Sequence, residues 1–144
     1  MKNSLTISKM FVFCLILSLM QIHAENYQVL SPDKRIKLNI KTDEKLSFSV
    51  SFDNNEIIAP SNIALTLSDG TLLGNRPKVI DIKKQTVDNI IIPLIKLKSA
   101  EIEEHFNELK LLFEGYFSLT CRVYNNGVAY RFEASFKDKI KIKN

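Results

Sequence analysis

Cysteine, tryptophan and long apolar runs are scarce in this sequence, and their scarcity excludes several classes of protein. The chain has no tryptophan and two cysteines, Cys14 and Cys121, in 144 residues. An apolar run at Met10–Met20 has eleven residues, too few to span a bilayer. There is no CxxC, no HExxH and no glycine-rich phosphate loop. The sequence therefore carries no signature of a dithiol redox enzyme, a zinc protease or a nucleotide-binding enzyme.

Residues 1–24 have the layout of a secretory signal peptide. The first region contains two basic residues, Lys2 and Lys9. The apolar run follows it, and a short polar segment then ends at Ala24. A lipid-modified cysteine would open the mature chain, but apolar residues continue past Cys14, so we do not expect lipidation. We expect cleavage after Ala24, export to the periplasm or the extracellular space, and no membrane attachment afterwards.

Residues 25–144 form one candidate domain of 120 residues. It contains 18 basic and 16 acidic residues, which gives a net charge of +2, and residues of the two signs are interspersed along the chain. A nucleic-acid surface would need a patch of one sign, so we expect no nucleic-acid partner. Cys121 alone remains, so the domain has no internal disulfide, and its place in an apolar row predicts a buried residue rather than a nucleophile.

Alternation of apolar and polar residues dominates this domain and predicts half-buried strands. The clearest rows place their apolar residues at every second position, in the segments 27–30, 36–42, 46–52, 116–124 and 128–136. A short strand at 56–58 should stop before Pro60. Turns are expected at Asp53–Asn55 and at Asn126-Gly127, the second because this pair tolerates positive φ.

The remaining segments are less regular. Residues 77–89 suggest one strand, and residues 90–98 suggest another that Pro93 interrupts. The last residues begin a further alternation with Ile140 and Ile142 and then stop. About nine strands fit, which predicts an all-β, antiparallel β-sandwich, and the interrupted last row suggests that the sandwich is incomplete.

The acidic stretch from Ala100 to Gly115 admits two conformations. Ile102, Phe106, Leu109 and Phe113 follow the spacing of a helix, whereas Leu109, Leu111 and Phe113 follow the alternation of a strand. The pattern alone leaves both open. A strand here would form a hairpin with the next one through a turn that holds Gly115.

The same stretch holds the candidate chemical groups. Glu101 and Glu103 would lie about 7 Å apart on a strand, a separation that glycoside hydrolysis could use. Glu104, His105 and Asn107 are the candidate metal ligands, although no second ligand pattern accompanies the histidine. Adjacent exposed acids are common on strands, so we expect no catalytic residue and no metal site here. The simpler interpretation is a solvated strand edge in which His105 and Asn107 bond to backbone.

Aromatic and basic residues offer the other candidates. Four tyrosines in the alternating strands could stack on sugar rings, although packing within a sheet is their commoner role: Tyr27, Tyr116, Tyr124 and Tyr130. The carbohydrate-binding residues cannot be chosen from the sequence. Arg122 and Arg131 face away from the apolar rows and should pair with acids such as Glu133.

Four segments in order resemble the N-terminal domain of family 97 glycoside hydrolases, exported enzymes that act on α-linked glucosides or galactosides. They are "LSPDKRIKLNI", "LSFSVSFDNNEIIAPSNIALTLSDGTLLG", "EIEEHFNEL" and "RVYNNGVAYRFEASF". The family usually has a tyrosine where Phe106 stands and an acid-bearing turn where "NNG" stands. The resemblance covers residues 25–144, about the first half of the family's sandwich, and favours a strand for the acidic stretch.

The resemblance implies a β-supersandwich in front of a (β/α)₈ barrel that carries the catalytic carboxylates. It also implies a calcium ion beside them, partly held by a sandwich glutamate that no residue here matches. We therefore expect no cofactor in this chain, which is truncated before the barrel, and no activity by itself. The expected function is the non-catalytic sandwich portion of such a glycosidase, with carbohydrate and the missing remainder of the enzyme as partners. The alternative is a stand-alone secreted carbohydrate-binding β-sandwich; a hydrolase acting through the acids near Glu101 is the third.

Overall fold

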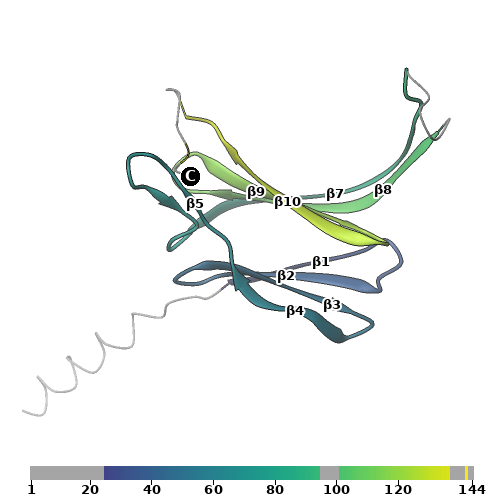
Figure 1. Cartoon of the computed structure of the whole chain (residues 1–144), viewed down its shortest axis with the longest axis horizontal. Coiled ribbons are helices and arrows are strands. Elements are labelled where there is room, and N and C mark those ends of the chain that lie inside the picture. Colours follow the sequence, from purple (N-terminus) through teal and green to yellow (C-terminus); the bar gives the residue numbers. More distant parts are fainter. Residues whose placement is uncertain (1–24, 95–100, 137–141, 143–144) are drawn as a thin grey trace, which may run out of the picture.

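Two facing antiparallel sheets make up the body of the protein (Figure 1). The computed structural model describes residues 25–94, 101–136 and 142; the expected signal peptide, residues 1–24, lies outside them. Ten strands and no helix occur in the described residues, which therefore also contain no helix suited to crossing a membrane. The expected all-β, antiparallel sandwich is confirmed.

The first sheet has the strand order β1-β2-β3-β4. Its strands are β1 (Glu25–Leu30), β2 (Ile36–Thr42), β3 (Leu46–Phe52) and β4 (Asn55–Asn62). A two-stranded sheet follows, formed by β5 (Leu65–Thr66) and β6 (Leu72–Leu73). Successive strands pair with each other because each connection is a short turn.

The second sheet has the order β10-β9-β8-β7. Its strands are β7 (Val79–Ile91), β8 (Ile102–Phe113), β9 (Phe117–Tyr124) and β10 (Gly127–Ala134). Strand β1 lies against β8, and β2 lies against β9. The two inner strands of the second sheet, β8 and β9, are thus covered by the first sheet.

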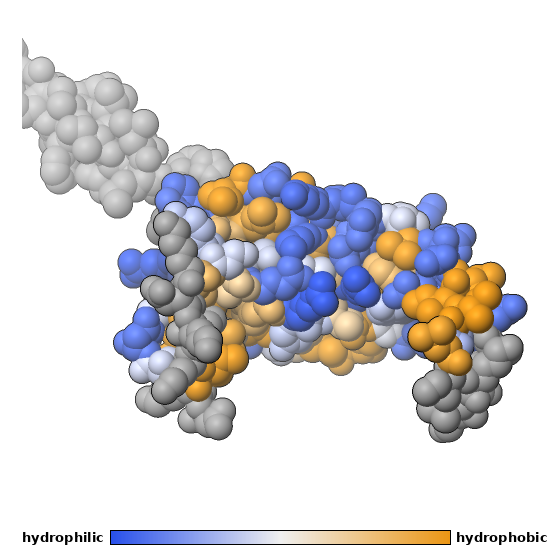
Figure 2. All heavy atoms as spheres, turned by 90° about the horizontal axis from the view of Figure 1, so that it is seen from above, coloured by the Kyte–Doolittle hydropathy of each residue, from blue (hydrophilic) through white to orange (hydrophobic). Residues whose placement is uncertain are grey.

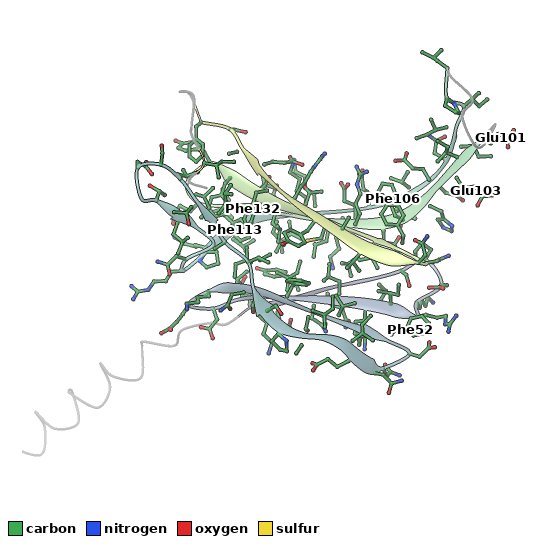
Figure 3. The ribbon with its side chains drawn as sticks, viewed as in Figure 1. Phe52, Glu101, Glu103, Phe106, Phe113 and Phe132 are labelled. Atoms are coloured by element: carbon green, nitrogen blue, oxygen red, sulfur yellow. The ribbon has the colours of Figure 1, made fainter. Side chains whose placement is uncertain are left out.

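The core lies between the sheets and uses the alternating rows that the sequence displays. Ile36, Leu38 and Ile40 are buried on β2, and the inward row of β9 is buried from end to end: Phe117, Leu119, Cys121 and Val123. The Phe117 ring contacts the rings of Phe113 and Phe132. Figure 3 labels Phe113 and Phe132, which lie close together. Each fully buried aliphatic or aromatic side chain contributes about 1.5–3 kcal/mol by leaving water.

Left-handed backbone marks the tight turns. Asp53 and Asn54 have φ values of 47° and 65° between the paired residues Phe52 and Asn55, which is the geometry of a type I′ hairpin. The hairpin expected at Asn126-Gly127 is present, since Tyr124 pairs with Gly127. The expectation of positive φ at Asn126-Gly127 is wrong, however. The positive φ angles of the described residues lie elsewhere, and this turn closes without them.

Two predicted strand boundaries are wrong. Strand β4 does not stop before Pro60 but runs through it to Asn62. This is possible because β4 is an edge strand and its pairing with β3 shifts register at that point, so no ladder bond requires the N–H that proline lacks. Ile90 and Ile91 continue β7 instead of starting another strand, and residues 92–94 are not in a strand. Residues 95–98 of the predicted strand lie outside the described residues.

The ends of β7 and β8 form an arm that extends beyond the sandwich (Figure 1). Residues 102–105 of β8 pair only with β7, because β9 begins to pair at Phe106. Large apolar side chains are exposed near the end of the arm and form a patch at one end of the molecule (Figure 2): Ile90, Ile91, Ile92, Leu94 and Ile102. Of the expected last row, Ile142 forms a bridge with Leu67, and Ile140 lies outside the described residues.

Candidate functional site

Most of the acidic stretch is strand β8, so the helical alternative is wrong. Leu109, Leu111 and Phe113 are buried toward the core, as the strand pattern predicts. Phe106 is also buried, but three positions before Leu109 it points to the opposite face of the sheet. The helix-like spacing arises because both faces of this strand are covered over part of its length. The predicted hairpin is confirmed, since Phe113 pairs with Phe117.

Glu101 and Glu103 lie at the far end of the arm, away from the sandwich (Figure 3). Both side chains are exposed, and Glu103 pairs through its backbone with Ile90. The two hollows described below are lined by other residues. Within the described residues, the fold therefore brings neither carboxylate into one of these hollows.

The alternation of β8 puts Glu104 on the opposite face of the strand from His105 and Asn107. Glu104 lies 3.8 Å from the Arg122 guanidinium, and His105 is exposed. Asn107 donates to the backbone oxygen of Leu30 at 2.8 Å and accepts from Thr86 Oγ1 at 2.7 Å, which confirms that it bonds to backbone. In the described residues, no three His, Cys, Asp or Glu side chains gather where they could hold a metal ion together.

Arg122 is the centre of a charge cluster on the outer face of the second sheet. Its Nε donates to Glu108 Oε2 at 2.7 Å, and its guanidinium lies 4.4 Å from the Phe106 ring centroid. The expected pairing of Arg122 with an acid is confirmed, and the acid is Glu108 because the register places it directly opposite Arg122. The bond to Glu108 is the main reason why the pKa of Arg122 is raised.

Glu133 is the centre of a second cluster on the same face. Its carboxylate accepts hydrogen bonds from Lys110 Nζ, from Thr120 Oγ1 at 2.9 Å and from Arg131 Nε at 2.7 Å. The predicted pairing of Arg131 with Glu133 is confirmed. The bond from Lys110 is the largest cause that lowers the pKa of Glu133 to about 2. The charges on this face are therefore largely compensated.

Three of the four candidate tyrosines have packing or hydrogen-bond partners. The ring centroids of Tyr124 and Phe106 lie 5.0 Å apart, and those of Tyr130 and Phe48 lie 5.5 Å apart. Tyr27 donates to the Glu25 carboxylate, and burial, followed by this neighbour, raises the pKa of Tyr27 to about 12. Tyr116 differs: it lies in the β8–β9 turn rather than in a strand, with φ of 63° and 78% of its surface exposed.

A hollow of about 560 Å³ lies beside this turn. Tyr116, Leu112 and Ile80 give it an apolar part, and Ser118, Lys110 and Glu133 give it a polar part. A second hollow of about 450 Å³ lies between β1 and β7, and most of its lining residues are polar in type, among them Lys84 and Asn107.

Cys121 is a free cysteine, and its side chain is buried as predicted. Its exposed fraction is 2%, and burial, with a smaller effect of Glu108, raises its pKa to about 12. A thiol that ionises so weakly is a poor nucleophile at neutral pH.

The sequence did not reveal the hollow beside Tyr116. Ile80 faces it because a register shift between Val79 and Asp81 leaves Ile80 as an extra residue in β7. The only sequence signal was Gly115, which marks the turn but not the conformation of Tyr116.

Comparisons with known proteins agree with this architecture. The family model described as "Glycosyl-hydrolase 97 N-terminal" matches residues 29–144. A retaining alpha-galactosidase of Bacteroides thetaiotaomicron is 28% identical over 131 residues, which are 91% of this chain and 20% of that protein. The chain thus spans about one fifth of the length of this relative.

Solved structures show the same fold. A glycoside hydrolase family 97 enzyme from Pseudoalteromonas sp. strain K8, in complex with acarbose, superposes with a TM-score of 0.72 at 21% identity. The match covers 81% of this chain and 19% of that one. A beta-arabinopyranosidase gives the same TM-score at 20% identity over 81% of this chain and 20% of its own. With the family model matching most of its length, the chain belongs to the family of N-terminal domains of family 97 glycoside hydrolases.

Proposed function

We propose that this chain is a non-catalytic sandwich that supports the catalytic part of a family 97 glycoside hydrolase and takes part in binding its carbohydrate. The family membership and the length of the relatives, about five times that of this chain, support the proposal. The partner is then the remainder of such an enzyme, in which this sandwich is one domain.

The observation that carries the non-catalytic role is the placement of the candidate carboxylates, since Glu101 and Glu103 are exposed at the far end of the arm (Figure 3). Glycoside hydrolysis needs a carboxylic acid with a raised pKa facing a second carboxyl across a cleft. Among the described residues, the carboxyl pKa values that shift clearly all fall: those of Asp33, Asp53, Asp69 and Glu133. Hydrogen bonds are the largest cause at each, so these groups stay ionised and cannot donate a proton at neutral pH.

The proposed carbohydrate carries an α-linked galactose or glucose. One relative is named an alpha-galactosidase, and structures of a family 97 enzyme hold acarbose or panose. Titration calorimetry with maltotriose and melibiose tests binding, and nitrophenyl α-glycosides test turnover. We expect binding without turnover. Turnover by the purified chain would contradict the non-catalytic role, and no heat with either sugar would contradict carbohydrate binding.

We also propose that the chain is exported and that residues 1–24 are removed. The layout of these residues supports this: a basic first region, an apolar run and a short polar segment that ends at Ala24. Mass spectrometry of the protein from its native cells should give a chain that begins at Glu25. A mature protein that retains Met1 and its apolar run would contradict export by this route.

A stand-alone carbohydrate-binding sandwich is the second candidate function. The bridge between Leu67 and Ile142 favours it, because Ile142 then lies beside the chain that directly follows β5. A sharp, cooperative melt of a monodisperse monomer would favour this candidate, whereas a partner-dependent fold would favour the supporting role.

A further inference from the structure

The hollow beside the β8–β9 turn combines an exposed ring with compensated polar groups. Its volume, about 560 Å³, falls within the range of about 300–1,000 Å³ that is usual for small-molecule sites. The site lies on the second sheet, at the sandwich end opposite to the arm's tip, where β8 turns into β9.

Tyr116 is held in an unfavourable backbone conformation for a bulky residue. Gly115 and Tyr116 are both left-handed, with φ of 93° and 63°, and only the first is a glycine. Such a conformation costs a residue with a Cβ free energy, and an exposed ring recovers little of it by packing. An exposed aromatic side chain in a strained turn indicates a role other than stability.

The turn that presents Tyr116 is fixed on both sides. The Glu114 N–H donates to the Lys78 oxygen at 2.9 Å, and the Ser135 N–H donates to the Tyr116 oxygen at 2.9 Å. These bonds tie the turn to the start of β7 and to the chain just after β10. The ring is therefore carried by a rigid support, which limits the entropy lost when a ligand binds.

The apolar part of the hollow extends beyond the ring. The bulge in β7 turns Ile80 outward, where 63% of its surface is exposed, and Leu112 lines the same hollow. Bulges commonly redirect a side chain next to a functional site. Ring, isoleucine and leucine together give a surface that suits the C–H face of a sugar.

The polar part favours a neutral ligand that bears hydroxyl groups. Lys110 and Glu133 form an ion pair, and Glu114, which also lines the hollow, lies 3.5 Å from the Lys78 ammonium, so each charged group of the lining has a partner of opposite sign. The hydroxyls of Ser118 and Ser135 and the remaining bonding capacity of the Glu133 carboxylate line the same space. Hydroxyl groups can exchange hydrogen bonds with all three, which a purely apolar ligand cannot do.

We infer that this hollow is a carbohydrate-binding site, in which the Tyr116 ring stacks on a sugar and Ser118 and Glu133 bond to its hydroxyls. This inference rests on the carbohydrate binding proposed above and names the place where it occurs. Three tyrosine variants of the full chain provide the test, each titrated with maltotriose and with melibiose. Tyr116→Asn removes the ring but tolerates the left-handed backbone, Tyr116→Phe keeps the ring, and Tyr130→Asn removes a tyrosine outside the hollow.

We expect Tyr116→Asn to weaken binding at least about tenfold, with Tyr116→Phe and Tyr130→Asn within about threefold of the unmodified chain. Chemical-shift mapping of the unmodified chain should place the sugar at the amides of residues 115–118 and 135, whether or not a variant folds. Unchanged affinity in Tyr116→Asn, or shifts confined to the hollow between β1 and β7, would overturn this site while carbohydrate binding stands. No binding of either sugar by the unmodified chain would overturn both.

Discussion

The side chain of Asn107 on β8 donates a hydrogen bond to the backbone oxygen of Leu30 on β1, 2.8 Å away and 77 residues apart in the sequence. The bond joins the two sheets where β1, an edge strand, crosses β8. Thr86 holds the other end of the amide, so the Asn107 side chain has one fixed orientation. A residue that the sequence suggested as a possible metal ligand thus connects the two layers of the sandwich.

Replacing Asn107 by leucine should reduce the free energy of unfolding by about 1–3 kcal/mol, because the part-buried Leu30 oxygen loses its donor. Urea denaturation followed by circular dichroism measures this. Thr86→Val is the matched control: it removes only the bond to the amide oxygen and should cost less. Equal losses in the two variants would mean that the bond between the sheets contributes nothing of its own.

Arg122 and Arg35 form a natural pair for testing how burial strengthens a charge cluster. Each guanidinium lies 4.4 Å from a phenylalanine ring centroid, and each bonds a carboxylate, at 2.7 Å for Arg122 and 2.8 Å for Arg35. The side chains of Glu108 and Asp53 differ, with 11% and 48% of their surface exposed. Arg122→Met should therefore cost about 1–2 kcal/mol of stability, and Arg35→Met clearly less.

Salt separates the two pairs further. Raising the ionic strength should weaken the contribution of Arg35 more than that of Arg122, because exposed charges are screened better. Denaturation of both variants at low and high salt checks this. If Arg35→Met cost more stability than Arg122→Met at low salt, burial would not be what sets the strength of these clusters.

Glu133 should make stability depend on pH in the acid range. Its folded pKa, about 2, lies below the ordinary value of 4.5, so the unfolded chain binds this proton more readily. The stabilisation is full above about pH 4.5 and is lost as the pH falls toward 2. Allowing for solvent screening, we expect about 1–2 kcal/mol.

Denaturation midpoints between pH 2 and pH 7 measure this effect. Glu133→Gln should be less stable at pH 7 and should flatten the acid limb of the profile. Glu103→Gln is the control, since it removes a carboxylate of the arm, outside this network. An acid limb that is unchanged in Glu133→Gln would assign the pH dependence to other groups.

Tyr116→Asn should stabilise the protein by about 0.5–1 kcal/mol, because asparagine adopts the left-handed backbone at lower cost. Little packing is lost, since the ring is largely exposed. Tyr130→Asn should instead destabilise, because it removes the ring contact with Phe48. Thermal melts of the two variants compare them directly. A lower melting temperature for Tyr116→Asn would mean that the ring stabilises the turn and that its strain has no separate function.

Rows of alternating residues were sufficient to predict most of the sheets. The inward sets of β2, β3 and β9 follow from period-two alternation, because one face of each strand meets the core. The same rule failed to separate helix from strand at Phe106 and Leu109, where the strand is covered on both faces. The strand end that was predicted before Pro60 was also wrong. Proline is tolerated there because β4 is an edge strand with a register shift, and both depend on a neighbouring strand that local sequence does not display.

The candidate site was predictable only in its parts. Tyrosines, arginines and Glu133 were identifiable as residue types, but their partners were not, since partners across a sheet follow from register. Arg122 meets Glu108 because β8 and β9 align there, and Ile80 faces the hollow because β7 carries a bulge beside Val79.

The sequence by itself determined that this chain is an antiparallel β-sandwich of a recognisable family and which rows of residues form its core. It could do so because alternation and turn chemistry are local properties of the chain. Only the tertiary structure decided that Asn107 joins the sheets, that two clusters compensate the charge of the outer face, and that Tyr116 stands exposed over a hollow. These features depend on strand register and on turns tied by distant backbone groups, and both are set when the sheets assemble.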